Sequence, residues 1–270
     1  MMDVVREIQK LNAINRATFV AVHVVIVLMA MCCPLFGSNE DPLKPVPDPL
    51  FQNGAASSNW SVFGDSFPAV GANEVLVQTH MYVGCVNRQA RQPAWVAYRV
   101  ERADWDTENA LSRNFSTPKH LREVCLEPSD FSKSGYELGH LYALQFVGAR
   151  DYGYEVNWLC AVAAQRPDLN KGPWLRAEER IRQRSLNGSV AVVAGQLWQT
   201  KMPALRNADE PHAVASHCWI MLTDDAGTES YLFPQGCKRD AELTEFSVEP
   251  AALRAMVAPR WIGRSTEEHR

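Results

Sequence analysis

The chain has 270 residues, of which 46% are hydrophobic, and its formal net charge at pH 7 is −4. This length and apolar content fit one sizeable globular domain with a small extra segment, and they exclude a chain dominated by disorder. The acidic balance argues against a nucleic-acid binder that relies on bulk positive charge, although a local basic groove remains compatible with it. None of the seven cysteines forms a CxxC pair, which argues against a zinc ribbon or a thioredoxin-like site.

The first predicted element is an uncharged run, ATFVAVHVVIVLMAMCCPLFG, at residues 17–37, long enough to cross a bilayer as one helix. A leader at 1–16 with three basic residues precedes it, and a linker rich in Pro, Asn, Ser and Gly follows at 38–60. The positive-inside rule leaves the leader in the cytosol or matrix and places the main domain on the non-cytosolic side. The long leader and the end MCCP favour an uncleaved transmembrane anchor over a cleaved signal peptide.

Alternating and apolar runs beyond the linker predict a sheet. The segment NEVLVQTHMYVGCV (73–86) alternates like a strand, PAWVAYRV (93–100) is predicted to pair with it, and residues 101–135 are irregular and polar. A short strand or loop is predicted at YELGHLYALQF, followed by strands in VNWLCAVAAQ, GSVAVVAGQLW, HAVASHCWIMLTD and ESYLFPQG. Between them, RPDLNKGPWLRAEERIRQRSL is typical of a loop entering an amphipathic helix, whose mixed-charge run predicts an ion-paired face. This order predicts an α+β domain around a mixed or antiparallel sheet.

Two residues near the start of that helix carry metal-ligand chemistry. On a continuous helix, the spacing from Asn170 to Glu178 corresponds to about 80° of rotation and about 12 Å of rise, so both side chains can face one cleft. An amide oxygen and a carboxylate are hard ligands of the kind Mg²⁺ accepts, with water at the other positions. The plainer alternative is a capping Asn170 and a solvated Glu178. His140, in YELGHLYAL, is by the same reasoning either a catalytic acid or base or a packed side chain.

Several segments occur together in order: SGYELGH, WLCAVAAQRPDLNKGPWLRAEE, VAVVAGQLW, VASHCW and YLFPQ. This series resembles the DNA/RNA non-specific endonucleases of the ββα-metal type, a family that includes secreted bacterial nucleases and mitochondrial endonuclease G. The resemblance implies a nuclease domain at 61–262, followed by a tail at 263–270.

The resemblance also implies a role for each matching residue. His140 is implied as the general base that activates water, and Asn170 as the direct ligand of Mg²⁺, for which Mn²⁺ is a substitute. Glu178 is implied to hold a metal-bound water, and Arg113 to face the phosphate. The supporting positions implied are Glu137, Gly139, Gln165 and Trp174. The substrate implied is DNA, RNA or both, cleaved without strong sequence preference because nothing in the scheme reads a base.

Two departures from the family pattern bear on activity. Leu138 stands where the family's signature has arginine, and Ala161 stands where the family has an asparagine. Losing one cation beside the developing charge costs about 10²–10³ in rate. Two functions therefore stay open: a membrane-anchored, Mg²⁺-dependent endonuclease attenuated by Leu138, and a catalytically inactive nuclease-fold accessory or scaffold subunit of a membrane assembly. Retention of four residues favours the enzyme: His140, Asn170, Glu178 and Arg113.

The sequence supports two interpretations of the cellular compartment. Resemblance to endonuclease G implies the mitochondrial inner membrane, with the domain facing the intermembrane space. Glycosylation sequons at Asn59, Asn114 and Asn187 favour the secretory pathway or the cell exterior. A second copy of the chain, in a homodimer, is also considered as a partner, and the pairing of the cysteines is left open.

Overall fold

The computed structural model describes residues 67–68, 70–105, 112–257 and 261–262, so the leader, the predicted anchor at 17–37, the linker and the tail lie outside the described residues. Within the described ranges the strands are β1 (Phe67–Pro68), β2 (Glu74–Gln78), β3 (Val83–Asn87), β4 (Gln92–Val100), β5 (Glu137–His140), β6 (Val162–Gln165), β7 (Val190–Leu197), β8 (His217–Asp224), β9 (Gly227–Pro234) and β10 (Trp261–Ile262). The α-helices are α2 (Pro167–Asn170), α3 (Pro173–Ser185) and α4 (Pro250–Val257). The 3-10 turns are η3 (Arg102–Asp104), η4 (Lys119–Leu121), η5 (Pro128–Phe131), η6 (Leu144–Phe146), η7 (Gly153–Asn157), η8 (Leu159–Ala161) and η9 (Leu243–Phe246). Among these described elements, no helix combines the length and apolarity that a membrane span requires.

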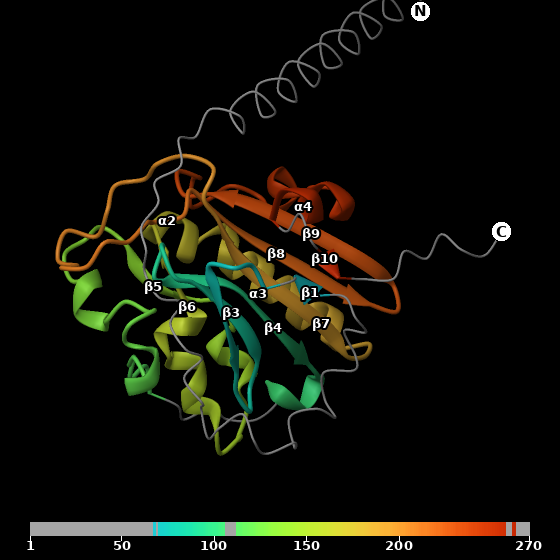
Figure 1. The fold of residues 1–270 in the computed structure, drawn as a ribbon. Helices are drawn as coiled ribbons and strands as arrows, with labels where there is room; N and C mark the ends of the chain where they lie inside the picture. Colours follow the sequence, from blue (N-terminus) through green and yellow to red (C-terminus); the bar gives the residue numbers. More distant parts are fainter. Residues whose placement is uncertain (1–66, 69, 106–111, 258–260, 263–270) are drawn as a thin grey trace, which may run out of the picture. The chain divides into compact units, whose positions relative to one another are not determined.

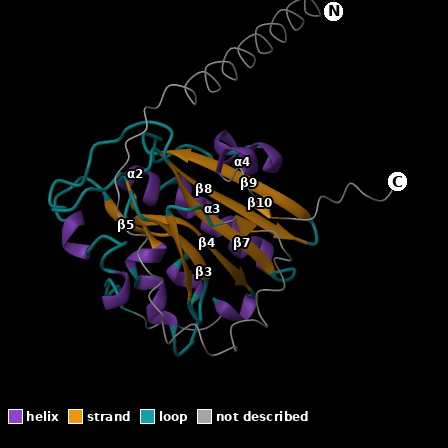
Figure 2. Ribbon diagram, viewed as in Figure 1, coloured by secondary structure: helices purple, strands orange, loops and turns teal. Residues whose placement is uncertain are grey.

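A six-stranded sheet in the order β2-β3-β4-β7-β8-β9 forms the centre of the domain (Figures 1 and 2). Every neighbouring pair in it is antiparallel, which confirms the predicted α+β class and its antiparallel alternative. Both faces are buried: Val96 and Tyr98 of β4 enter a large core on one face, while Trp95 enters a smaller core on the other. Helix α3 contributes to the large core, and Leu253 of α4 contributes to the small one.

The strand predicted over 73–86 is in fact the hairpin β2–β3. A turn at 79–82 breaks the run, because the Thr79 hydroxyl accepts hydrogen bonds from the backbone N–H groups of Met81 and Tyr82, at 3.1 and 2.9 Å. Such a side-chain acceptor competes with strand pairing. The predicted pairing of 93–100 with this region is confirmed, since β3 pairs with β4.

The strand predicted over 156–165 is also shorter than expected. Only β6, at its end, is extended, and the preceding residues form the turns η7 and η8. The apolar content of this run suggested a strand. All these turn residues except Trp158 and Tyr154 are buried, but their backbone makes local hydrogen bonds, such as Ala161 N–H to Trp158 O at 2.8 Å. Periodicity does not separate such a buried turn from a buried strand.

The helix expected to carry both Asn170 and Glu178 is interrupted, so the rotation and rise predicted for a continuous helix are wrong. Asn170 ends α2, and Gly172 separates α2 from α3. A Cβ on Gly172 would lie 2.4 Å from the backbone oxygen of Asp168 and 2.5 Å from that of Arg239, so only glycine fits this break. Pro173 then starts α3 at a position where its missing N–H costs nothing.

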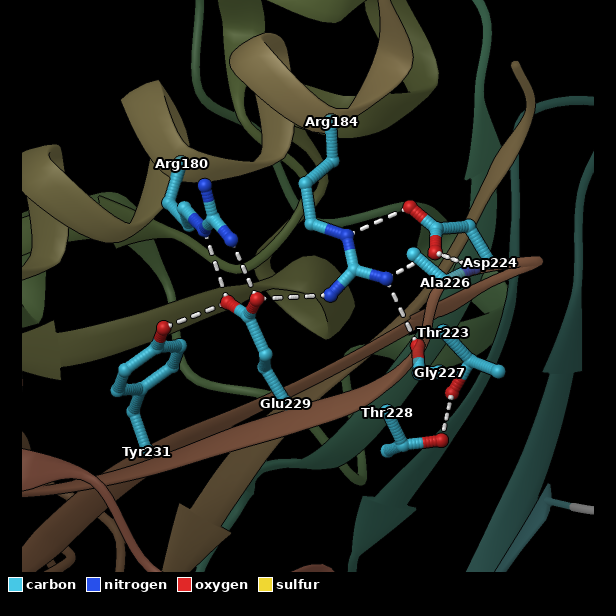
Figure 3. Close-up of polar contacts among 9 residues, drawn as sticks. All are labelled: Arg180, Arg184, Thr223, Asp224, Ala226, Gly227, Thr228, Glu229 and Tyr231. Atoms are coloured by element: carbon cyan, nitrogen blue, oxygen red, sulfur yellow. Dashed lines mark hydrogen bonds and ion pairs between the residues drawn. The ribbon is translucent and has the colours of Figure 1, made fainter. Parts of the chain in front are cut away.

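The predicted ion-paired face of α3 is confirmed (Figure 3). Arg184 donates to both carboxylate oxygens of Asp224 and to the backbone oxygen of Gly227, and its other nitrogen lies 2.9 Å from Glu229. Arg180 also binds Glu229, with its Nε donating to a carboxylate oxygen at 2.9 Å. The pairs tie the end of α3 to the β8–β9 hairpin.

Arg184→Met is expected to lower the free energy of unfolding by about 3 kcal/mol, because it leaves a nearly buried carboxylate without its partner. The Arg184 side chain is 7% exposed and that of Asp224 is 12% exposed. Chemical denaturation measures the change. Arg182→Met is the matched control, because Arg182 and Glu179 form an exposed pair that solvent screens, so its loss should change the stability much less. Equal effects of the two substitutions would contradict the prediction.

Candidate active site

The small β5–β6 hairpin positions the central histidine. Leu138 pairs with Ala164 and His140 pairs with Val162 in the antiparallel register. Because side chains alternate along a strand, His140 and Leu138 share one face of β5, and Glu137 shares the other with Gly139. A Cβ on Gly139 would lie 2.2 Å from Oε1 of the fully buried Gln165. Gly139 and Gln165 therefore support the hairpin by their packing.

The imidazole of His140 is held in one orientation by Asn157. His140 Nε2 lies 2.8 Å from Asn157 Oδ1, and Asn157 Nδ2 donates to the backbone oxygen of Ser112 at 3.0 Å. Since the amide nitrogen is committed to Ser112, the amide oxygen must accept a proton from Nε2. The neutral imidazole then carries its proton on Nε2, which leaves Nδ1 as the basic atom.

His140 is neutral at physiological pH. Burial lowers the pKa of His140 to about 4, against a small upward effect of the Asn157 hydrogen bond. The ring of Phe115 packs against it, with centroids 5.0 Å apart. Trp174, which is 1% exposed, donates its indole N–H to the backbone oxygen of His140 at 3.2 Å. Trp174 thus ties α3 to the backbone of β5 at the histidine.

Asn170 and Glu137 meet at the end of α2. Asn170 Nδ2 donates to Glu137 Oε2 at 2.8 Å, and Lys171 Nζ pairs with the other carboxylate oxygen. Burial alone would raise the pKa of Glu137, but the hydrogen bonds from Lys171 and Asn170 outweigh it and lower that pKa. Because its NH₂ group is taken by Glu137, Asn170 presents its amide oxygen as the atom available to a cation.

Glu178 lies one turn into α3, and its carboxylate is only partly compensated. Gln145 Nε2 donates to Oε2 at 3.1 Å. Burial raises the pKa of Glu178 to about 7, although the Gln145 hydrogen bond and the charge of Arg113 act in the opposite direction. The charge of Arg113 also lowers the pKa of His140, in addition to the larger effect of burial. The exposed Arg113 therefore lies within electrostatic reach of both Glu178 and His140.

This donor set fits a hydrated divalent cation. Hard cations prefer amide and carboxylate oxygens, and Mg²⁺ keeps several waters rather than demanding a full protein cage. Asn170 supplies a free amide oxygen, and the raised pKa of Glu178 marks a buried carboxylate that a positive charge would stabilise. In the described part of the chain, no cluster of three or more His, Cys, Asp or Glu residues could hold a metal instead.

Comparison with known proteins decides the family. The family model of the DNA/RNA non-specific endonuclease matches residues 61–257, most of the chain. The chain belongs to the DNA/RNA non-specific endonuclease family.

Two further similarities agree with membership of this endonuclease family. A nuclease from Serratia marcescens is 27% identical over 195 residues, covering 67% of this chain and 72% of that relative. A chain in the crystal structure of the EndoG/EndoGI complex superposes with a TM-score of 0.64 at 19% identity, covering 73% of this chain and 88% of that one. The latter similarity shows the shared fold.

Family membership confirms the predicted resemblance and the assignment as an endonuclease, a hydrolase. The family is one of divalent-metal-dependent nucleases. The site residues predicted from the endonuclease pattern lie on three elements: His140 and Glu137 on β5, Asn170 on α2, and Glu178 and Trp174 on α3. Contacts join Asn170 to Glu137 and Trp174 to the backbone of His140.

Leu138 and Ala161, the two departures from the endonuclease pattern, both pack in or against the hydrophobic core of the domain. Leu138, beside His140, packs against the large core. Ala161 is fully buried and offers the site only its backbone oxygen, which accepts from Leu141 N–H at 2.9 Å. An amide side chain reaches the histidine instead from Asn157, one 3-10 turn earlier.

Reasoning from the sequence missed three contacts of the endonuclease site. Asn157 holds His140, Gln145 holds Glu178, and Lys171 pairs with Glu137. Asn157 and Gln145 sit in apolar runs, where a lone buried amide is the only available signal, because such a group must find a hydrogen-bond partner. Lys171 directly follows the proposed metal ligand and was visible as a neighbouring cation.

Proposed function

We propose that this endonuclease hydrolyses phosphodiester bonds in DNA and RNA with His140 as general base and one Mg²⁺, for which Mn²⁺ can substitute. The observation that carries the proposal is the bond between His140 and Asn157, which leaves Nδ1 unprotonated. Asn170 would bind the cation directly through its amide oxygen, and Glu178 would hold a water of the cation's shell. When bound, Mg²⁺ supplies charge neutralisation at the phosphate.

Two side chains of the protein would act in the reaction: one removes the proton of the attacking water, and one opposes the negative charge of the transition state. His140 Nδ1 removes a proton from water that attacks in line with the departing 3′ oxygen, so the products carry 5′ phosphates. The phosphodiester's negative charge raises the pKa of the nearby imidazole, which brings its low pKa closer to neutrality. Arg113 opposes the negative charge of the transition state. No residue in this set contacts a base edge, so the proposal predicts low sequence specificity.

A cleavage assay on the full chain tests the proposal. Supercoiled plasmid DNA and structured RNA should both be cut in Mg²⁺, and an excess of EDTA should stop the reaction. Cleavage of neither polymer in Mg²⁺ or Mn²⁺ would overturn the proposal. The outcome would instead support the accessory or scaffold role, which Leu138 favours because it removes a cation from the site.

We also propose that residues 17–37 anchor the protein in a membrane, with the nuclease domain on the non-cytosolic side. The uncharged run and the basic leader support this orientation. The mitochondrial inner membrane, facing the intermembrane space, is the first candidate, and the secretory pathway is the alternative. N-terminal sequencing of purified protein should find the run retained, and a mature start between residues 31 and 40 would refute the anchor. A homodimer stays a prediction, tested by sedimentation of the purified chain.

The affinity for Mg²⁺ is expected to fall as the pH drops below about 7, by at most about tenfold per pH unit, toward the weaker affinity of the protein with neutral Glu178, because a proton on Glu178 opposes binding of the cation. Because the pKa of Glu178 is raised to about 7, its carboxylate is charged above about pH 7 and neutral below it, so the affinity for Mg²⁺ decreases as the pH decreases. His140, with its pKa near 4, does not titrate in this window. Calorimetric titration between pH 5.5 and 8 measures the slope. Glu178→Gln should bind more weakly and lose the slope, whereas a slope that persists in this variant would contradict the assignment.

A further inference from the structure

An exposed pair of tyrosines lies on the segment that holds the catalytic histidine. Tyr152 is 44% exposed and Tyr154 is 49% exposed, and they are the only aromatic residues among the large exposed hydrophobics of the described chain. Both belong to the turn around η7, whose last residue is Asn157. Two exposed aromatic rings on the segment that also holds the catalytic histidine offer a surface to which a ligand can bind.

The ring of Tyr152 is part of a rigid stack. It lies on the imidazole of His80 with centroids 3.6 Å apart and planes 9° from parallel. Glu155 fixes that imidazole, because one carboxylate oxygen lies 2.8 Å from Nδ1 and the other accepts the His80 backbone N–H at 2.8 Å. The Glu155 side chain is 4% exposed while that of His80 is 53% exposed, so a buried anchor holds a solvent-facing ring. A preorganised ring loses little entropy when a second ring stacks on it.

Tyr154 lies on the same 3-10 turn as Asn157, the residue that holds His140. Residues three apart on a 3-10 turn are aligned, so Tyr154 lies above Asn157, about 6 Å along the turn. Asn157 in turn lies 2.8 Å from His140. The Tyr154 ring stands edge-on to Trp158, with centroids 6.0 Å apart. The segment that bears both tyrosines is therefore the one that also positions His140.

The chain segment that bears two exposed cations bonds to the end of the segment that bears the rings. Ser116 pairs with the ring-bearing segment, accepting from Leu159 N–H at 3.0 Å and donating to Asn157 O at 3.2 Å. The strand of chain through Ser116 carries Arg113 and Lys119, both exposed. Rings flanked by cations are the arrangement by which proteins hold single-stranded nucleic acid, with bases stacked on the rings and phosphates near the cations.

We propose that Tyr152, stacked on His80, and Tyr154 form a platform for unpaired bases next to the scissile phosphate. The proposal rests on the proposed nuclease function and names its preferred substrate: single strands and unpaired segments, rather than closed duplex. Bases inside a duplex are already stacked and paired, so they cannot lie on the platform. Every base has a π face, which keeps the binding tolerant of sequence.

Equilibrium binding tests the platform without interference from cleavage. The full chain carrying His140→Ala is titrated, in EDTA, against a labelled single-stranded oligonucleotide and a hairpin duplex of equal charge. Added to this background, Tyr152→Ala and Tyr154→Ala should each weaken single-strand binding by about fivefold to hundredfold, the range for loss of one stacked base, and change duplex binding by less than about twofold. Tyr152→Trp should retain binding because it keeps an aromatic face.

The control is Leu186→Ala, which removes a side chain that is 49% exposed on the last turn after α3 and should leave both affinities unchanged. Equal losses on both substrates, or unchanged single-strand binding in both tyrosine variants, would overturn the platform. If that happens while the chain with His140 intact cleaves nucleic acid, only the platform fails. If the chain neither binds nor cleaves either substrate, the proposed function fails with it.

Discussion

His140→Ala is expected to slow cleavage by about 10²–10⁴-fold at neutral pH, the contribution of a positioned general base. Mg²⁺ affinity should stay close to that of the parent, because His140 is not a ligand in the proposed scheme, and thermal stability should change little, because the side chain is not fully buried. The measurement is single-turnover plasmid nicking, paired with calorimetric Mg²⁺ titration and thermal unfolding. Parent-like cleavage by His140→Ala would show that the histidine only packs.

Asn170→Ala provides the matched comparison for His140→Ala. It should abolish cleavage as well, but it should also weaken Mg²⁺ binding, because it removes the amide oxygen that Glu137 leaves available. The two variants therefore match in lost activity and differ in metal titration. Unchanged Mg²⁺ binding in Asn170→Ala would reject Asn170 as the ligand and leave Glu178 as the primary donor.

Leu138→Arg is expected to raise the cleavage rate by tenfold or more, within the range that one cation beside a developing charge supplies. Leu138 shares the face of β5 with His140, so a longer side chain from this position can extend toward the phosphate. Leu138→Met is the control, since it conserves volume without adding charge and should leave the rate unchanged. The readout is the nicking rate at saturating Mg²⁺.

An unchanged rate in a folded Leu138→Arg variant would contradict this expectation. It would show that Arg113, alone or together with Lys171, which is paired with Glu137 beside the proposed ligand, already serves the phosphate. Combining Leu138→Arg with Lys171→Met separates these cases, because additive effects indicate independent roles and rescue indicates a shared one.

The sheet could be predicted because its strands carry their pattern locally. Runs such as VAVVAGQL have the length and β-branched content of buried strands, and β7 appears where they predict it. The errors occurred where side chains override such patterns. Thr79 closes a turn inside a strand-like run, and the buried turns η7 and η8 are as apolar as a strand. The periodicity of the sequence predicts neither the turn at Thr79 nor these two buried turns.

The sequence proposes the main members of the candidate site but not the residues that support them. An ordered series of motifs singles out His140, Asn170 and Glu178, and in the fold α2, which ends with Asn170, contacts both β5 and α3. Asn157 and Gln145, which orient His140 and Glu178, come from segments separated in sequence from their partners, so only tertiary packing pairs them. The break at Gly172 was missed for the same reason, because its cause includes the distant backbone of Arg239.

That break gives the stretch after β9 an influence on the active site. The backbone oxygen of Arg239 limits the space at Gly172 and also accepts Arg176 Nη1 at 2.8 Å, so it acts as a spacer between the helix that ends with Asn170 and the helix that carries Glu178. The spacing of the two helices that carry the proposed metal-site residues therefore depends in part on the backbone of a loop that is distant in sequence. The charge of Arg239 also lowers the pKa of Glu137, the partner of Asn170, so this loop acts on the site through its backbone and through one side chain. We expect a change in the length of the loop to alter the cation preference of the enzyme.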